Sequence, residues 1–209
     1  MAKTIDYFFT PVSPWTYLGA PRLDAMVRKH GAELRYKPCD YGKVFPVSGG
    51  LPVAQRPKQR QAYRLVELER WRDFLGMKLN IHPKHFPVPS DFAARTVVAA
   101  KQSGADPGKL AAALLRGVWA EERDVSDRAT VAAICDECGL DGKALIAAAD
   151  GAKARSEFDA NTAEAIERQV FGAPTYIYKD KLYWGQDRLD FLERALADHP
   201  SPAKTERRP

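Results

Sequence analysis

The stretch FFTPVSPWTYLG, residues 8–19, joins an apolar, aromatic run to a helix-start signal. The segment that leads into it, KTIDYFFT at 3–10, is rich in aromatic residues and predicts a β-strand. Ser13 is a preferred N-cap residue, and Pro14 suits the first helical position because an N–H there would have no partner. We therefore predict a strand followed at once by a helix that begins at Pro14 and is ended by Gly31.

The next residues complete a strand–helix–strand unit. AELRYKPC, residues 32–39, alternates apolar and charged side chains and predicts a second strand, joined to the first by a parallel crossover. Three glycines and three prolines in residues 41–57 predict an irregular loop. A helix is expected over 58–76, and an alanine-rich region over 91–169 predicts several more. Breaks between those helices are expected at 104–108, near Asp127, at Gly139 and near Gly151.

The end of the chain returns to a β pattern. PTYIYKDKLYWG predicts a hairpin over 174–184 around a Lys-Asp-Lys turn, and a closing helix follows with Asp187 as its N-cap. This order predicts an α/β, thioredoxin-like fold with an inserted all-helical domain. We expect a thioredoxin-like domain built from 1–57 and 170–198, a helical insertion over 58–169, and a flexible basic tail over 199–209.

Composition narrows the class of protein. Hydrophobic residues make up 45% of the 209 residues and charged residues 28%, as in ordinary globular proteins. No stretch approaches the roughly 20 apolar residues that cross a bilayer, and the start lacks the apolar core of a secretory signal. We therefore expect no membrane partner and a cytoplasmic location. Three cysteines without an export signal predict reduced thiols.

The basic stretch RPKQRQAYR, residues 56–64, accounts for part of the net charge of +5. Nucleic-acid binding would require wider basic coverage with exposed aromatic side chains, and acidic residues follow closely in the same predicted helix. We therefore expect no nucleic-acid partner. An anionic small molecule bound near Lys43, Gln55 and Arg56 is the favoured functional interpretation.

Ser13 has two interpretations. The simpler one is a helix cap, worth about 1 kcal/mol. The other uses the positive end of the helix, which stabilises an anion and in thioredoxin-like enzymes lowers the pKa of the protein's own thiol. Because residues 8–19 contain no cysteine, a thiolate here would have to come from a bound thiol, with the Ser13 hydroxyl donating to its sulfur.

Two segments near the end could bind a peptide. Most X–Pro bonds are trans, so frequency alone favours a trans Ala173–Pro174 bond. A cis bond would instead turn the Ala173 N–H and C=O outward, where they could pair with an extended tripeptide thiol. In WGQDR at 184–188, Gly185 allows close approach of a ligand. Gln186 and Asp187 could then hold an amino acid's carboxylate and ammonium.

Cys135 and Cys138 form a CxxC pair. A redox pair normally lies at a strand-to-helix junction, where the helix dipole lowers a thiol pKa. This pair lies at the end of a predicted helix with two carboxylates between the thiols, and both features should raise the thiol pKa values. The pattern disfavours a redox or zinc role.

Three segments taken together resemble the 2-hydroxychromene-2-carboxylate isomerase family: the F-x-x-x-S-P-W-x-Y-L-G-A-P-R-L start, the QRP-to-ERWRDFLG helix, and VFGAPTYIYKDKLYWGQDRLDFLERAL. This family has the DsbA-like form of the thioredoxin fold and is related to kappa-class glutathione transferases. The resemblance implies a homodimeric, glutathione-dependent isomerase of bacterial aromatic degradation. It would convert 2-hydroxychromene-2-carboxylate to trans-o-hydroxybenzylidenepyruvate through a transient thiol adduct, without a metal.

The resemblance also implies roles for residues. Ser13 would lie beside the glutathione sulfur. The tripeptide would be held by Ala173, Pro174, Trp184, Gly185, Gln186 and Asp187. The aromatic carboxylate substrate would contact Lys43, Gln55, Arg56 and Phe86.

Three other functions remain open at this point. A kappa-like transferase would conjugate glutathione to electrophiles at the same site and consume it. A thiol-disulfide oxidoreductase would use Cys135 and Cys138. A glutathione-binding module would bind the tripeptide without turning anything over.

Overall fold

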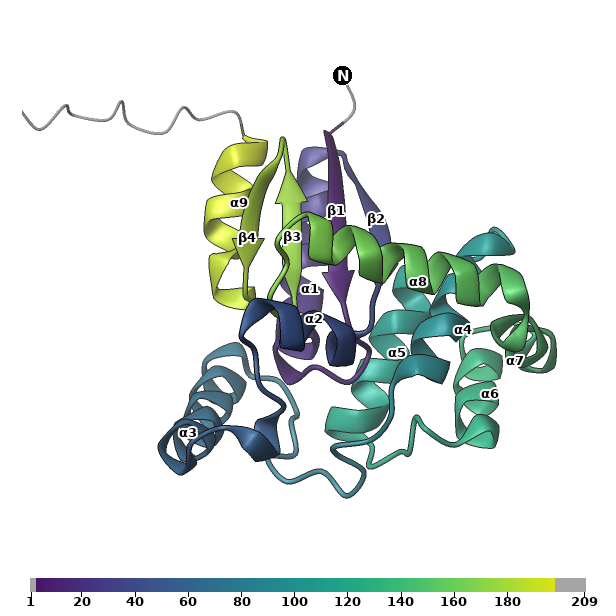
Figure 1. Ribbon diagram of the computed structural model, residues 1–209, viewed down its shortest axis with the longest axis horizontal. Coiled ribbons are helices and arrows are strands. Elements are labelled where there is room, and N and C mark those ends of the chain that lie inside the picture. Colours follow the sequence, from purple (N-terminus) through teal and green to yellow (C-terminus); the bar gives the residue numbers. More distant parts are fainter. Residues whose placement is uncertain (1–2, 198–209) are drawn as a thin grey trace, which may run out of the picture.

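The computed structural model describes residues 3–197, so the predicted tail over 199–209 lies outside the described residues (Figure 1). The strands are β1 (Lys3–Phe9), β2 (Ala32–Pro38), β3 (Thr175–Tyr178) and β4 (Lys181–Trp184). The helices are α1 (Pro14–His30), α2 (Tyr41–Ser48), α3 (Lys58–Leu75), α4 (Asp91–Gln102), α5 (Pro107–Ala120), α6 (Arg128–Glu137), α7 (Gly142–Asp150), α8 (Ala152–Glu167) and α9 (Leu189–Leu196). Two 3-10 turns, η1 (Val53–Gln55) and η2 (Gln186–Arg188), precede α3 and α9.

The four strands form one mixed sheet in the order β2-β1-β3-β4. β1 and β2 are parallel, as the crossover predicts, whereas β3 runs antiparallel to both β1 and β4. The predicted Lys-Asp-Lys turn is confirmed: Lys179 and Asp180 connect β3 to β4, both with positive φ. The predicted thioredoxin-like order of elements is therefore confirmed for the sheet.

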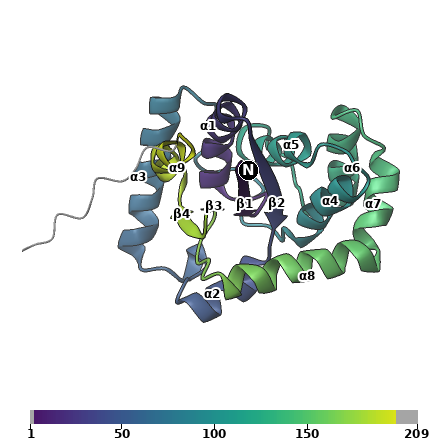
Figure 2. The same cartoon turned by 90° about the horizontal axis from the view of Figure 1, so that it is seen from above.

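Helices cover both faces of the sheet. Figure 2 shows α1 and α9 over one face and α2 and α8 over the other. Alternate side chains of β1 serve the two layers, because Ile5 and Tyr7 join the core beneath α1 and α9 while Phe8 joins the core beneath α2 and α8. Burial on both faces explains why β1 ends in consecutive aromatic residues, Tyr7 to Phe9.

The helical region does not form one separate block. α4 to α7 pack together beside the β2 edge, α8 runs back along the sheet, and α3 lies on the other side of the molecule against α1 (Figures 1 and 2). The breaks predicted at 104–108, Asp127, Gly139 and Gly151 are confirmed. Asp127 caps α6, with its carboxylate accepting a hydrogen bond from the Thr130 N–H at 2.8 Å. The domain boundaries drawn at 57/58 and 169/170 remain a prediction.

Two local predictions are wrong. Residues 41–57 are not an irregular loop throughout, because Asp40 caps α2 by accepting from the Gly42 N–H at 2.7 Å, and Gly49 ends that helix in the left-handed region. Tyr41 and Val44 bury one side of α2. Asp187 is not the N-cap of the last helix.

The reason is a 3-10 turn that intervenes after Gly185. α9 begins only at Leu189, the cap position is Arg188, and no side chain caps it. The Asp187 carboxylate accepts instead from the Arg188 guanidinium at 2.7 Å. Across residues 3–197, no helix combines the length and apolar character that a bilayer crossing requires.

Candidate active site

The strand register brings Ser13 and the Ala173–Pro174 bond together. β1 ends at Phe9, and a short turn connects it to Ser13. The antiparallel strand β3 starts beside that end of β1, with Thr175 opposite Phe8. Residues just before β3 therefore face the start of α1. The Ala173–Pro174 peptide bond is cis in the structure, the less frequent of the two forms considered.

Ser13 is buried and performs the capping role. Its Oγ accepts a hydrogen bond from the Thr16 N–H at 3.2 Å, and its hydroxyl proton is directed at the Ala173 carbonyl across 3.5 Å. The second contact is at the outer limit of a hydrogen bond, so the proton can be redirected to a stronger acceptor at little cost. Capping and donation to a bound anion are compatible because they use different parts of the hydroxyl.

The first turn of α1 offers further stabilisation to an anion. Pro14 has no N–H, and the Trp15 N–H makes no hydrogen bond to another residue in the range 3–197. The first turn also contains no acidic side chain that would neutralise the positive helix end. This helix start therefore combines a hydroxyl proton, an amide without a partner among residues 3–197 and a positive dipole, and both Ser13 and Trp15 line one cavity.

That cavity has a volume of about 610 Å³, large enough for a small aromatic molecule together with part of a peptide. Ser13 and Trp15 line it at the start of α1. One wall consists of Phe171, Gly172, Ala173 and Trp184 next to the β3–β4 hairpin. A second wall includes Arg56, Arg60, Arg64, Phe86 and Val88.

The hairpin wall depends on two glycines. A Cβ on Gly172 would approach the Trp184 indole nitrogen to 2.3 Å, so the half-exposed indole lies directly over this residue. Gly185 has φ +100° and donates its N–H to the Pro174 carbonyl at 2.9 Å. These two residues therefore fix how Trp184 and the Ala173–Pro174 segment border the cavity.

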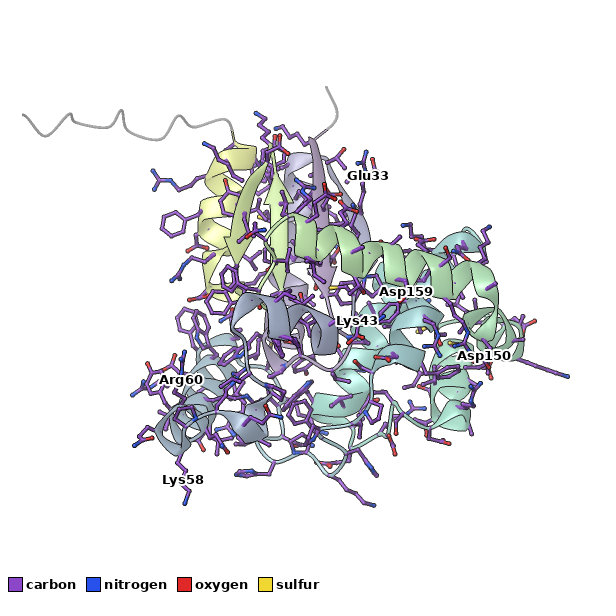
Figure 3. All side chains as sticks on the ribbon, in the orientation of Figure 1. Glu33, Lys43, Lys58, Arg60, Asp150 and Asp159 are labelled. Atoms are coloured by element: carbon purple, nitrogen blue, oxygen red, sulfur yellow. The ribbon has the colours of Figure 1, made fainter. Side chains whose placement is uncertain are left out.

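Several predicted site residues lie outside this cavity. Lys43 on α2 and Asp159 on α8 point toward one another in Figure 3 and form an exposed ion pair at 2.9 Å. Gln55 is exposed on η1, away from the cavity lining. Among the predicted substrate contacts, Arg56 and Phe86 do line the cavity.

The polar residues of WGQDR also point elsewhere. Gln186 is buried, and both its backbone carbonyl and its side-chain oxygen accept hydrogen bonds from the Arg22 guanidinium on α1. Asp187 is exposed beside Arg188, as described above. Of the predicted tripeptide-binding set, Ala173 and Trp184 line the cavity together with Ser13, whereas Pro174 and Gly185 lie directly behind them.

Sequence reasoning missed Arg60 and Arg64 as site residues. Arg60 and Arg64 are four residues apart and share one face of α3, and Arg56 precedes that helix. Such a row of cations is the usual pattern of a solvated surface. The structure turns that face toward the cavity. The signal was the repeat of cations at every fourth residue without interleaved carboxylates.

The CxxC pair lies on α6, away from the cavity. Cys135 is fully buried inside the helix and Cys138 follows its last turn. Burial, and then the neighbouring groups, raise the pKa of Cys135 to about 12, and burial also raises the pKa of Cys138. Both thiols therefore stay protonated near neutral pH, where a redox pair needs a thiolate. Among residues 3–197 no set of three His, Cys, Asp or Glu side chains is arranged to hold a metal ion.

This environment leads to a prediction for the double variant Cys135→Ser/Cys138→Ser. We expect its catalytic turnover to stay within about twofold of the unmodified protein, because neither thiol touches the cavity. Iodoacetamide should also modify both thiols slowly in the folded protein at pH 8, since their raised pKa values leave little thiolate. Rapid labelling of Cys135, or loss of activity in a double variant that folds normally, would contradict this assignment.

The sheet order and the helix start together define a thioredoxin-like protein that holds a serine where enzymes of this fold carry a reactive cysteine. Family comparison agrees and is more specific. Residues 4–197 match the DsbA-like thioredoxin domain family, and the chain belongs to it. Within that fold, the chain belongs to the 2-hydroxychromene-2-carboxylate isomerase family, as its relatives show.

The 2-hydroxychromene-2-carboxylate isomerase of Sphingobium xenophagum is 31% identical over 201 residues, which cover 95% of this chain and 100% of that relative. A solved structure of a 2-hydroxychromene-2-carboxylate isomerase superposes with a TM-score of 0.73 at 28% identity, covering 93% of this chain and 94% of the other. The cytosolic disulfide reductase DsbM of Pseudomonas aeruginosa, solved with GSH, superposes with a TM-score of 0.65 at 20% identity over 93% and 99% of the two chains. That last likeness concerns the fold alone.

Proposed function

We propose that this chain isomerises 2-hydroxychromene-2-carboxylate to trans-o-hydroxybenzylidenepyruvate and that it uses glutathione to do so. Family membership supports the reaction. The observation that carries the thiol requirement is the start of α1, where Ser13 and Trp15 line a cavity that no cysteine lines and the Trp15 N–H has no partner among residues 3–197. A site built to hold a thiolate, without a thiol of its own, fits a bound thiol cofactor.

The residues present fit a tripeptide thiol. The Ala173 carbonyl has only the long contact with Ser13, and the Ala173 N–H makes no hydrogen bond within the described part of the chain. Such a backbone segment can pair with the backbone of an extended peptide. The Trp184 indole, which lies over Gly172, would cover the tripeptide on the hairpin side.

When bound, glutathione supplies a nucleophilic thiolate whose reversible addition makes the substrate's double bond a single bond that rotates, and whose departure restores the double bond. Ser13 and the Trp15 N–H stabilise negative charge on the sulfur at the start of α1. This favours the thiolate before the reaction and again after the leaving step. Arg56, Arg60 and Arg64, which line the cavity, attract the substrate carboxylate and stabilise negative charge that develops on the adjacent oxygen.

The kappa-like transferase is the main competing function because it would use the same cavity. Product analysis separates the two, since isomerisation returns glutathione and conjugation consumes it. The proposal also includes a homodimer in the cytoplasm, as the family resemblance implies. Light scattering at micromolar concentration measures whether the chain is a dimer.

The test is a reaction of the purified chain with 2-hydroxychromene-2-carboxylate, with and without glutathione. We expect the approach to isomer equilibrium to require glutathione, while total free glutathione stays constant throughout. Accumulation of a stable glutathione conjugate would favour the transferase. Full activity without any thiol would remove glutathione from the mechanism and leave the isomerase assignment in place.

A further inference from the structure

One wall of the cavity carries positive charge without a matching carboxylate. Arg56, Arg60 and Arg64 all line it, and no Asp or Glu side chain of the described residues lies within 4 Å of their guanidinium groups. These charges are close enough to repel one another. Burial lowers the pKa of Arg56 most, and the positive charge of Arg60 lowers it further. Burial likewise lowers the pKa of Arg64 most, and the charge of Arg56 adds to that effect. Most other arginines in the structure form ion pairs.

Arg64 is the member of this group that the fold holds in place. Its guanidinium carbon lies 5.4 Å from the centre of the Phe86 ring and 5.8 Å from the Trp119 ring, and these two rings pack on each other at 4.8 Å. Contact with two aromatic rings orients the planar guanidinium. Arg56 has fewer donors free for a ligand, because its Nε already donates to the Leu51 carbonyl at 2.8 Å. Arg60 is exposed.

The environment of Arg64 is costly without an anion. Its Nη2 atom is enclosed and has no hydrogen-bond partner among residues 3–197, and burial lowers the pKa of the guanidinium to about 10. A partly desolvated cation with an unpaired donor is unfavourable unless something compensates it. A carboxylate is the natural complement because it accepts two parallel hydrogen bonds from one guanidinium.

Arg64 is also connected to the turn before Ser13 through Trp119. Trp119, which it contacts, is fully buried and donates its indole N–H to the Val12 carbonyl at 3.2 Å, one residue before Ser13. Ala173 and Trp184, which would hold the tripeptide, line the same cavity. A ligand anchored on Arg64 would therefore lie in the cavity that Ser13 also lines.

We infer that Arg64 is the specificity-determining anchor for the carboxylate of the aromatic substrate, with Arg60 adding positive charge at the rim. This inference rests on the proposed function and assigns a residue that the sequence motifs did not. It places the substrate's carboxylate against Arg64 and its ring beside Phe86.

The test compares Arg64→Met and Arg64→Lys with Arg70→Met, a matched change on α3 at an exposed residue that pairs with Glu67 on the same helix. We expect Arg64→Met to raise the KM for 2-hydroxychromene-2-carboxylate at least tenfold, Arg64→Lys to recover part of that loss, and Arg70→Met to change nothing. Calorimetry with trans-o-hydroxybenzylidenepyruvate should show the same weakening. Its methyl ester and glutathione should each bind all the proteins within about twofold.

Each other outcome counts for or against the inference. An unchanged KM in a correctly folded Arg64→Met variant that still isomerises overturns it while leaving the proposed function standing. Equal weakening of acid and ester would make Arg64 a structural residue, and weakened glutathione binding would assign it to the cofactor. If the unmodified chain turns over nothing but binds the product acid through Arg64, the proposed function fails and the carboxylate subsite stands. Absence of any carboxylate binding contradicts both.

Discussion

Replacing Ser13 with alanine is expected to lower isomerase turnover by about ten- to a hundredfold. The variant loses a hydroxyl proton that is free to donate to the bound sulfur, and a hydrogen bond to a charged group contributes about 1.5–3 kcal/mol. Each 1.36 kcal/mol corresponds to about a tenfold change in rate. Steady-state measurement at saturating glutathione isolates this effect, because it removes any difference in cofactor affinity.

The same variant should also lose a helix cap. We expect a loss of about 1 kcal/mol in the free energy of unfolding, since the Thr16 N–H loses its acceptor. Asp141→Ala is the matched control, because Asp141 caps α7 by accepting from the Ala144 N–H at 2.9 Å, away from the cavity. It should lose comparable stability and keep full activity. Equal turnover in Ser13→Ala and the unmodified protein would remove the hydroxyl from the mechanism.

Replacing Trp119 with alanine is expected to cost about 3–5 kcal/mol of unfolding free energy, the range for deleting a large buried aromatic side chain. Trp119 is fully buried, packs on Phe86 and Arg64, and bonds the turn before Ser13. Because the total free energy of unfolding of a native protein is only about 5–15 kcal/mol, this loss is a large fraction of the stability. Urea unfolding followed by far-ultraviolet circular dichroism measures it.

Two further variants make this prediction specific. Trp119→Phe keeps most of the ring but leaves the Val12 carbonyl without its donor, so an intermediate loss is expected. Trp184→Ala removes an indole that is half exposed and should cost clearly less than Trp119→Ala. A Trp119→Ala protein as stable as Trp184→Ala would show that the Trp119 platform is not part of the core.

The sequence predicted the elements whose signals are local. Asp127 and Gly139 mark helix ends through their own backbone preferences, and the Lys179–Asp180 turn is set by the hairpin it connects. These predictions are confirmed because the helix ends and the turn do not depend on contacts with residues distant in sequence. The same reasoning placed Cys135 inside a helix, where burial raises its thiol pKa.

The errors arose where tertiary packing decides. α2 forms in a segment rich in glycine and proline because Tyr41 and Val44 bury against the sheet, which no local propensity reports. The direction of Lys43 follows from that helix, since α8 supplies Asp159 as its partner. Arg64 could not be distinguished from a solvated cation, because Phe86 and Trp119, the rings that hold it, are distant in sequence.

The proposed reaction requires a thiolate that a ligand supplies and that the start of α1 stabilises. The most direct measurement is a pH titration of the ultraviolet thiolate absorbance of glutathione bound to the protein, with free glutathione and the Ser13→Ala complex as references. We predict an apparent thiol pKa for bound glutathione at least one unit below the ordinary value of about 8.5, and a smaller shift in the variant. An unchanged or raised thiol pKa in the complex, or no binding of glutathione at all, would contradict the account.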